Sequence, residues 1–122
     1  MPLQQVTFDP KGPQLEAEVR CGFAQAGAYV LTLWDHNNVQ SRWEGTFFNP
    51  DDDTFTLPGK AAEQNGRLVQ CLFSVEILPP EKRYALMLTI WQGGQKVGVL
   101  TEAGETSESQ VMKNLYARLV AP

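Results

Sequence analysis

The chain has 122 residues, of which 43% are apolar and 20% charged, and its 14 acidic residues against 10 Lys and Arg give a formal charge of −4. At this length an ordinary hydrophobic core can hold one domain together without a structural metal or many disulfides. The acidic balance excludes nucleic acid as an expected partner, because phosphate binding needs a concentrated excess of Lys and Arg.

The N-terminal residues show no targeting pattern. Met1–Gln5 lack the basic stretch and apolar run of a secretory signal. The longest apolar stretches, such as Tyr84–Trp91, are less than half the roughly 20 residues that a membrane-spanning helix needs. We expect no membrane partner and a cytoplasmic location, with a mature secreted or periplasmic protein as the alternative. Residues 1–12 are predicted to form a loose arm, and residues 13–122 a single domain.

Four segments have the residue pattern of long strands. Apolar residues alternate with polar ones in Gln14–Cys21 and Leu68–Leu78, which is typical of strands with one buried face. Ala28–Trp34 and Tyr84–Trp91 are apolar on both faces and are predicted to be central strands.

Turn residues predict two hairpins that begin at these central strands. Residues 35–38, Asp-His-Asn-Asn, lead into a strand at Val39–Phe48, and residues 92–95, Gln-Gly-Gly-Gln, lead into a strand at Lys96–Thr101. A short strand is expected at Thr54–Leu57. One face of the strand after the first turn carries both signs of charge, as is typical of a soluble edge strand, and such a strand is also a place where a partner can dock. The residues of that face are Gln40, Arg42, Glu44 and Thr46, and a second face of the same kind on another strand has Gln14, Glu16, Glu18 and Arg20.

The C-terminal segment, residues 107–120, is expected to be a helix. Its apolar residues fall at helical spacing, and Ser107 with Gln110 matches a capping box. These apolar residues are Val111, Met112, Leu115, Tyr116, Leu119 and Val120. A strand is the alternative, because Val111, Leu115, Ala117 and Leu119 would share one face of it, interrupted by Lys113.

About seven short strands without alternating helices predict a mainly β protein, an antiparallel β-sandwich. The positions of Cys21, Trp34 and Cys71 resemble those of immunoglobulin domains, since Trp34 follows Cys21 by 13 residues and Cys71 follows Cys21 by 50. The chain has Val69 where that family has a tyrosine two residues before the second cysteine. The resemblance therefore implies an immunoglobulin-like architecture and no family membership.

Both cysteines are predicted to point into the core. We expect Cys21 and Cys71 to be free thiols that behave as small apolar residues. A disulfide between them is the alternative, and it belongs to an oxidising compartment. Two distant cysteines and one histidine do not supply the usual four ligands of a zinc site.

The densest acidic run is Asp51, Asp52 and Asp53. Several carboxylate oxygens close together suit Ca²⁺, but the run lacks the spacing of an EF-hand loop, and Asp after Pro is also ordinary turn chemistry. We therefore expect a solvated loop and no cofactor, with a bound calcium ion as the alternative.

Three tryptophans, Trp34, Trp43 and Trp91, are candidates for ligand contact. Packing in the core or at its rim is the favoured interpretation, and a stacking platform for a carbohydrate or a protein is the alternative.

The sequence shows no pattern of residues that would carry catalysis. His36 falls in a polar turn, and the chain has neither a Gly-x-Ser-x-Gly nucleophile elbow nor a glycine-rich phosphate loop. We therefore expect a non-catalytic binding or protein-interaction module that acts through a sheet face, an edge strand or loops. The alternative is a carbohydrate-binding module that uses the three tryptophans, with calcium at Asp51–Asp53.

Overall fold

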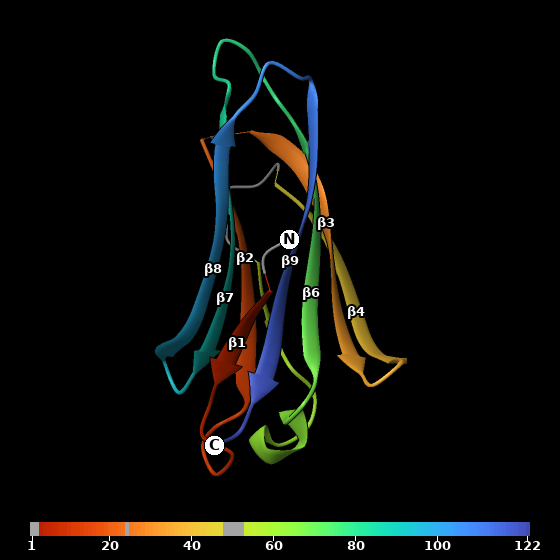
Figure 1. The fold of residues 1–122 in the computed structure, drawn as a ribbon, viewed down its shortest axis with the longest axis vertical. Coiled ribbons are helices and arrows are strands. Elements are labelled where there is room, and N and C mark those ends of the chain that lie inside the picture. Colours follow the sequence, from red (N-terminus) through yellow and green to blue (C-terminus); the bar gives the residue numbers. More distant parts are fainter. Residues whose placement is uncertain (1–2, 24, 48–52) are drawn as a thin grey trace.

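Two β-sheets face each other in the computed structural model, which describes residues 3–23, 25–47 and 53–122 (Figure 1). Within these residues nine strands form a five-stranded sheet, in the order β1-β9-β6-β3-β4, and a four-stranded sheet, in the order β5-β2-β7-β8. The strands are β1 (Leu3–Thr7), β2 (Leu15–Gly22), β3 (Ala26–Asp35), β4 (Asn38–Thr46), β5 (Asp53–Thr56), β6 (Leu68–Glu76), β7 (Arg83–Gln92), β8 (Gln95–Glu105) and β9 (Gln110–Val120).

The segments expected to be strands are strands, apart from Phe48 at the end of one of them, which lies outside the described residues, and the mainly β fold is confirmed. Period-two alternation places one set of side chains between the sheets, as in β2, where Leu15, Ala17 and Val19 are buried. The central strands β3 and β7 each pair on both edges, as expected of central strands.

Both predicted hairpins are confirmed. Asp35 pairs with Asn38 across a two-residue turn in which His36 has a φ of 57°, and Gln92 pairs with Gln95 across Gly93 and Gly94. The two glycines have φ values of 58° and 77°, in the left-handed region that hairpin turns of this kind require.

The predicted C-terminal helix is wrong, because residues 110–120 form β9. This strand pairs antiparallel with β6 and parallel with β1, so its backbone hydrogen bonds are made on both sides. Leu115, Ala117 and Leu119 are buried in the core, whereas Met112 is 60% exposed. The apparent helical stripe therefore mixes residues from the two faces of a strand.

Residues 1–12, expected to be an arm, contain β1. It pairs with β9 from Leu3 to Thr7, and Val6 and Phe8 are buried in the same core as the other strands. Only one residue of β1 is buried, so its sequence carries no visible alternation. A second element that we did not predict is a short 3₁₀ helix at Ala61–Gln64.

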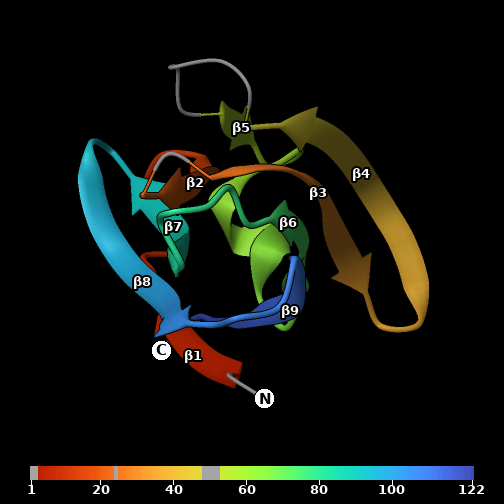
Figure 2. The ribbon, with the colours of Figure 1, turned by 90° about the horizontal axis from the view of Figure 1, so that it is seen from above.

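The core lies between the sheets, and the two long sides of the sandwich differ. On one side β1 packs against β8 so closely that a side chain at Gly98 would lie 2.5 Å from Val6. On the other side β4 reaches the short strand β5 through a stacked pair, Trp43 and Phe55, with ring centroids 5.4 Å apart. Viewed from above, β4 lies at the rim, and its hairpin turn extends away from the four-stranded sheet (Figure 2).

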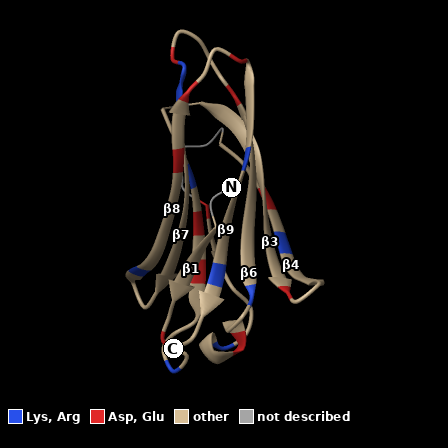
Figure 3. Cartoon of the chain, viewed as in Figure 1, with Lys and Arg blue, Asp and Glu red and all other residues tan. Residues whose placement is uncertain are grey.

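Charged residues of both signs are interspersed along the strands and loops (Figure 3). Among the described residues, no helix has the length and apolar character needed to cross a membrane.

Candidate functional site

The three candidate tryptophans lie on three different surfaces. Trp34 is on the outer face of the five-stranded sheet, Trp43 on the inner side of β4, and Trp91 on the outer face of the four-stranded sheet. All three are half-buried. A single platform made of the three side chains is therefore not formed.

Trp34 is held by a row of hydrogen bonds across β3, β6 and β9. Its indole N–H donates to Gln70 at 2.9 Å, and the side-chain amide of Gln70 donates to Asn114 at 3.0 Å. These bonds fix the orientation of the ring on the sheet. Packing at the rim of the core stays the prediction for this tryptophan.

Trp43 belongs to an aromatic cluster at the β4 side of the sandwich. It stacks on Phe55, which contacts Tyr29, and Tyr29 contacts Phe47 at a ring-centroid distance of 5.4 Å. The Tyr29 hydroxyl donates a hydrogen bond to Asp53. Burial, together with the neighbouring Asp53 carboxylate, raises the pKa of Tyr29 well above its usual range, so its hydroxyl stays protonated.

The hydrogen bond from Tyr29 also gives Asp53, one of the three residues of the acidic run, a structural role. Asp53, at the start of β5, accepts a hydrogen bond from the Tyr29 hydroxyl, whereas Asp51 and Asp52 lie outside the described residues. In the part of the chain that the structure describes, no three His, Cys, Asp or Glu side chains are grouped to hold a metal ion.

Trp91 has polar neighbours on the outer face of the four-stranded sheet. Its indole N–H donates to Glu18 at 3.2 Å, and the Lys96 ammonium lies 5.3 Å from the ring centroid. A hollow of about 240 Å³ adjoins the ring, lined also by Glu16 and Thr54. An aromatic ring next to carboxylates and a hydroxyl can stack on a ligand and accept its hydrogen bonds.

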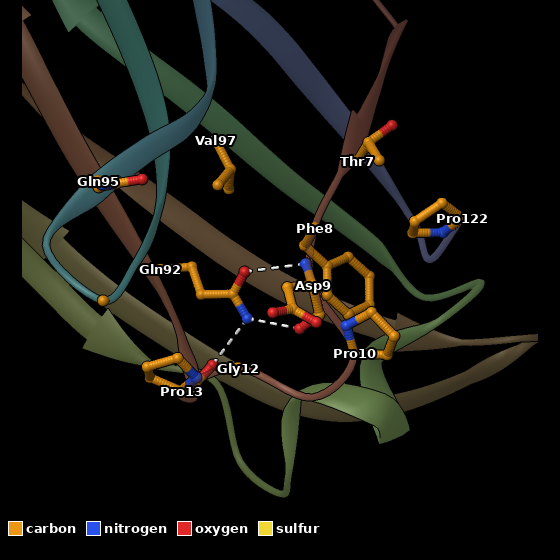
Figure 4. A pocket seen from close by; sticks show the side chains of 11 residues that line it. Thr7, Phe8, Asp9, Pro10, Gly12, Pro13, Gln92, Gln95, Val97 and Pro122 are labelled. Carbon is orange, nitrogen blue, oxygen red and sulfur yellow. Dashed lines mark hydrogen bonds between the residues drawn. The ribbon is translucent and has the colours of Figure 1, made fainter.

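A larger open hollow of about 590 Å³ lies where the β1–β2 loop meets the β7–β8 hairpin (Figure 4). The side-chain amide of Gln92, one of the polar groups that line it, forms hydrogen bonds with the loop itself. It accepts from the Asp9 N–H at 2.9 Å and donates to the carbonyls of Asp9 at 2.7 Å and Pro13 at 2.9 Å. The Asp9 carboxylate accepts from the N–H of Lys11 at 2.9 Å. These polar groups hold the β1–β2 loop in place, and no pattern in the sequence predicted this role.

Both cysteines are free thiols on opposite sheets. Burial raises the pKa of Cys21 to about 11 and raises the pKa of the more deeply buried Cys71 further above its usual value. A thiol with a raised pKa carries little thiolate at neutral pH and is a weak nucleophile.

His36 is paired with its neighbour in the β3–β4 turn. Its Nδ1 lies 2.8 Å from an Asp35 carboxylate oxygen, and Arg67 lies 3.5 Å from the other oxygen. The hydrogen bond to His36 and the charge of Arg67 lower the pKa of Asp35. The His36 side chain is 92% exposed, so its imidazole lies in solvent.

The outer edge of β4 has no strand beside it in the described part of the chain. Among the described residues, β4 ends the strand order of its sheet and pairs with β3 alone. The Phe47 N–H donates to the Gly27 carbonyl, so the backbone groups of Phe47 point toward β3. In an antiparallel pair, successive residues direct their backbone groups alternately toward and away from the neighbouring strand. The backbone groups of Arg42, Glu44 and Thr46 therefore point away from β3.

The side chains at this edge are exposed and carry opposite charges. Arg42 and Glu44 lie on the same face with their charged groups 3.5 Å apart, and their side chains are 59% and 69% exposed. The sequence indicated this mixed-charge face. Only the strand order shows that β4 is the last strand of its sheet.

Comparisons of the chain with protein-family models, with curated proteins and with solved structures found no match.

Proposed function

We propose that the chain is a non-catalytic protein-interaction module that docks an extended strand of its partner along the free edge of β4. The observation that carries this proposal is the row of outward-facing N–H and C=O groups at Arg42, Glu44 and Thr46. Main-chain hydrogen bonds to such a row supply affinity for an added strand, and the alternate side chains supply specificity.

The other sheet edges suit this role less well. β5 has four residues, and β1 packs along β8, where Val6 lies over Gly98. β4 has nine residues, and its side chains are exposed or half-buried along its whole length. A long exposed edge of this kind is the usual template for strand addition.

The proposal takes the sandwich to be immunoglobulin-like in architecture. In support, β2 pairs with β7, β3 pairs with β6, and β9 lies next to β6, with a cysteine on β2 and another on β6. The order of the strands along the chain differs from that of immunoglobulin domains. Here β6, the partner of β3, comes before β7, the partner of β2.

Photo-crosslinking from the β4 edge tests the docking proposal. A photoreactive benzophenone amino acid at Thr46 should give a crosslinked product with one defined protein, whereas the same group at Val99, which is 44% exposed on β8, should not. Glu44→Pro should abolish the product, because it removes an outward N–H without removing a bond to β3.

Equal yields from Thr46 and Val99, or a product that persists in Glu44→Pro, would contradict docking at this edge. The thermal unfolding of Glu44→Pro serves as the control for folding.

A second candidate function is carbohydrate binding at Trp91. The observation that favours it is the hollow beside the ring, which brings Glu16, Glu18 and Thr54 to the edge of the indole. We expect that one glycan of a panel quenches the tryptophan fluorescence of the native chain and of Trp34→Ala, but not that of Trp91→Ala. Unchanged fluorescence with every glycan, or quenching that persists in Trp91→Ala, would contradict this role.

A further inference from the structure

We infer that the strand docked on β4 is the β4 of a second copy of this chain, paired antiparallel with Arg42 of each copy opposite Glu44 of the other. This inference rests on the proposed function, since it names the partner at the same edge. It is carried by the direction of the backbone groups of β4 and by the order of its charges.

Backbone geometry restricts how two β4 strands can pair. Arg42, Glu44 and Thr46 direct their N–H and C=O groups outward, whereas Trp43 and Gly45 direct theirs toward β3. Antiparallel pairing brings outward-facing residues opposite one another, so a two-fold axis must pass through a residue of β4. An axis between two residues would place outward groups opposite inward ones.

Charge favours one axis among those that remain, because the axis at Trp43 is the one that places residues of opposite charge, Arg42 and Glu44, opposite each other. An axis at Arg42 would place two arginines directly opposite each other, and an axis at Glu44 would place two glutamates opposite each other. Like charges in directly opposed positions destabilise a strand pair. An axis at Trp43 places Arg42 opposite Glu44 twice, and both pairs are of the type that exchanges two backbone hydrogen bonds. The centre of this interface therefore has about four backbone bonds and two pairs of opposite charge.

The inner face of β4 fits the same register. Trp43 is half-buried and stacks on Phe55 of its own chain. With the axis at Trp43, the two Trp43 residues form the closely spaced pair that exchanges no backbone bonds, about 4.5 Å apart at Cα. Aromatic side chains in such opposed positions stabilise strand pairing.

The dimer should be weak and dependent on concentration. Stable dimers bury about 1,200–2,000 Å² in total, and a strand pair along one edge supplies only part of such an area. We therefore expect a monomer in dilute solution and a dimer in concentrated solution, joined as one continuous ten-stranded sheet across the two copies.

Charge reversal tests both the partner and the register. Sedimentation of the native chain up to millimolar concentration should show a monomer–dimer equilibrium. Arg42→Glu alone and Glu44→Arg alone should each lower the association constant at least tenfold, because each places like charges opposite each other. The double variant Arg42→Glu/Glu44→Arg should restore it, and an equimolar mixture of the two single variants should form a heterodimer.

The mixture also controls for folding, since two unfolded chains would not form a defined heterodimer. A native chain that stays monomeric at millimolar concentration, or single variants that dimerise as well as the native chain, would overturn the inference. A monomeric chain that still crosslinks from Thr46 to a different protein would overturn self-pairing and leave strand docking at β4 intact. A monomer without any crosslinked product would contradict both.

Discussion

Two buried glutamines fasten the loops at opposite ends of the sandwich. Gln25 is 3% exposed, accepts from the Leu78 N–H at 2.7 Å and donates to the carbonyls of Glu81 and Arg83, each at 2.9 Å. Gln92 holds the β1–β2 loop in the same way. Glutamine is normally a surface residue, so neither role could be predicted from the sequence. The partners are backbone groups distant in the chain, and only the folded structure identifies them.

Replacing Gln25 should therefore destabilise the protein although the residue is polar. Gln25→Ala should lower the free energy of unfolding by about 1–3 kcal/mol, because it leaves buried backbone groups unpaired. The matched control is Gln5→Ala on the exposed side of β1, which should change it by no more than about 0.5 kcal/mol. Urea unfolding of the two variants measures the difference, and equal effects would contradict the role of Gln25.

The buried thiols predict a loss of stability in alkaline solution. The pKa of Cys21 is raised from 9.0 to about 11 in the folded chain, so between these values the unfolded chain has lost a proton that the folded chain keeps. The free energy of unfolding should be unaffected by this group below pH 9 and should fall as the pH rises from 9 toward 11. Cys21→Ala should show a shallower fall in urea titrations over this range. If the free energy of unfolding of Cys21→Ala falls as steeply as that of the native chain, the raised pKa of Cys21 is contradicted.

At the scale of elements, alternation predicted the strands with one buried face, and segments apolar on both faces predicted the central strands β3 and β7. It did not reveal β1, whose single buried residue is Val6. In β9 two periodicities competed, because Met112 and Tyr116 lie at helical spacing although both project from the outer face of the sheet. Hydrogen bonding to strands on both sides decides in favour of the strand, and this information comes from distant parts of the chain.

β4 itself depends on a glycine for its position over the core. A side chain at Gly45 would meet the ring and hydroxyl of Tyr29, which is 2% exposed and cannot move aside easily. Gly45→Ala should lower the free energy of unfolding by about 1–3 kcal/mol, whereas Thr46→Ala, at the neighbouring exposed position, should have an effect within about 0.5 kcal/mol. Thermal unfolding compares the two. A Gly45→Ala variant as stable as the native chain would show that β4 does not pack on Tyr29 as described.

At the scale of the whole molecule, the strand order decides which candidates can act together. The tryptophans could be chosen from the sequence, but their separation onto three surfaces follows from how the sheets are assembled. The alternating charges of Arg42 and Glu44 were equally visible in the sequence. Their significance comes from the position of β4 at the end of its sheet. Because charges of both signs are dispersed over the molecule, this pattern acts locally, through the register of a docked strand (Figure 3).

Amide hydrogen exchange along β4 tests the central claim most directly, because it follows the individual backbone groups. In dilute solution the amides of Trp43 and Gly45 should be protected by β3, whereas those of Arg42, Glu44 and Thr46 should exchange rapidly. In concentrated solution the amides of Arg42 and Glu44 should become protected, because these residues lie opposite each other across the axis at Trp43, while the amide of Val99 on β8 should not change. Rapid exchange of Arg42, Glu44 and Thr46 at every concentration and in the presence of the crosslinked partner would contradict docking at β4.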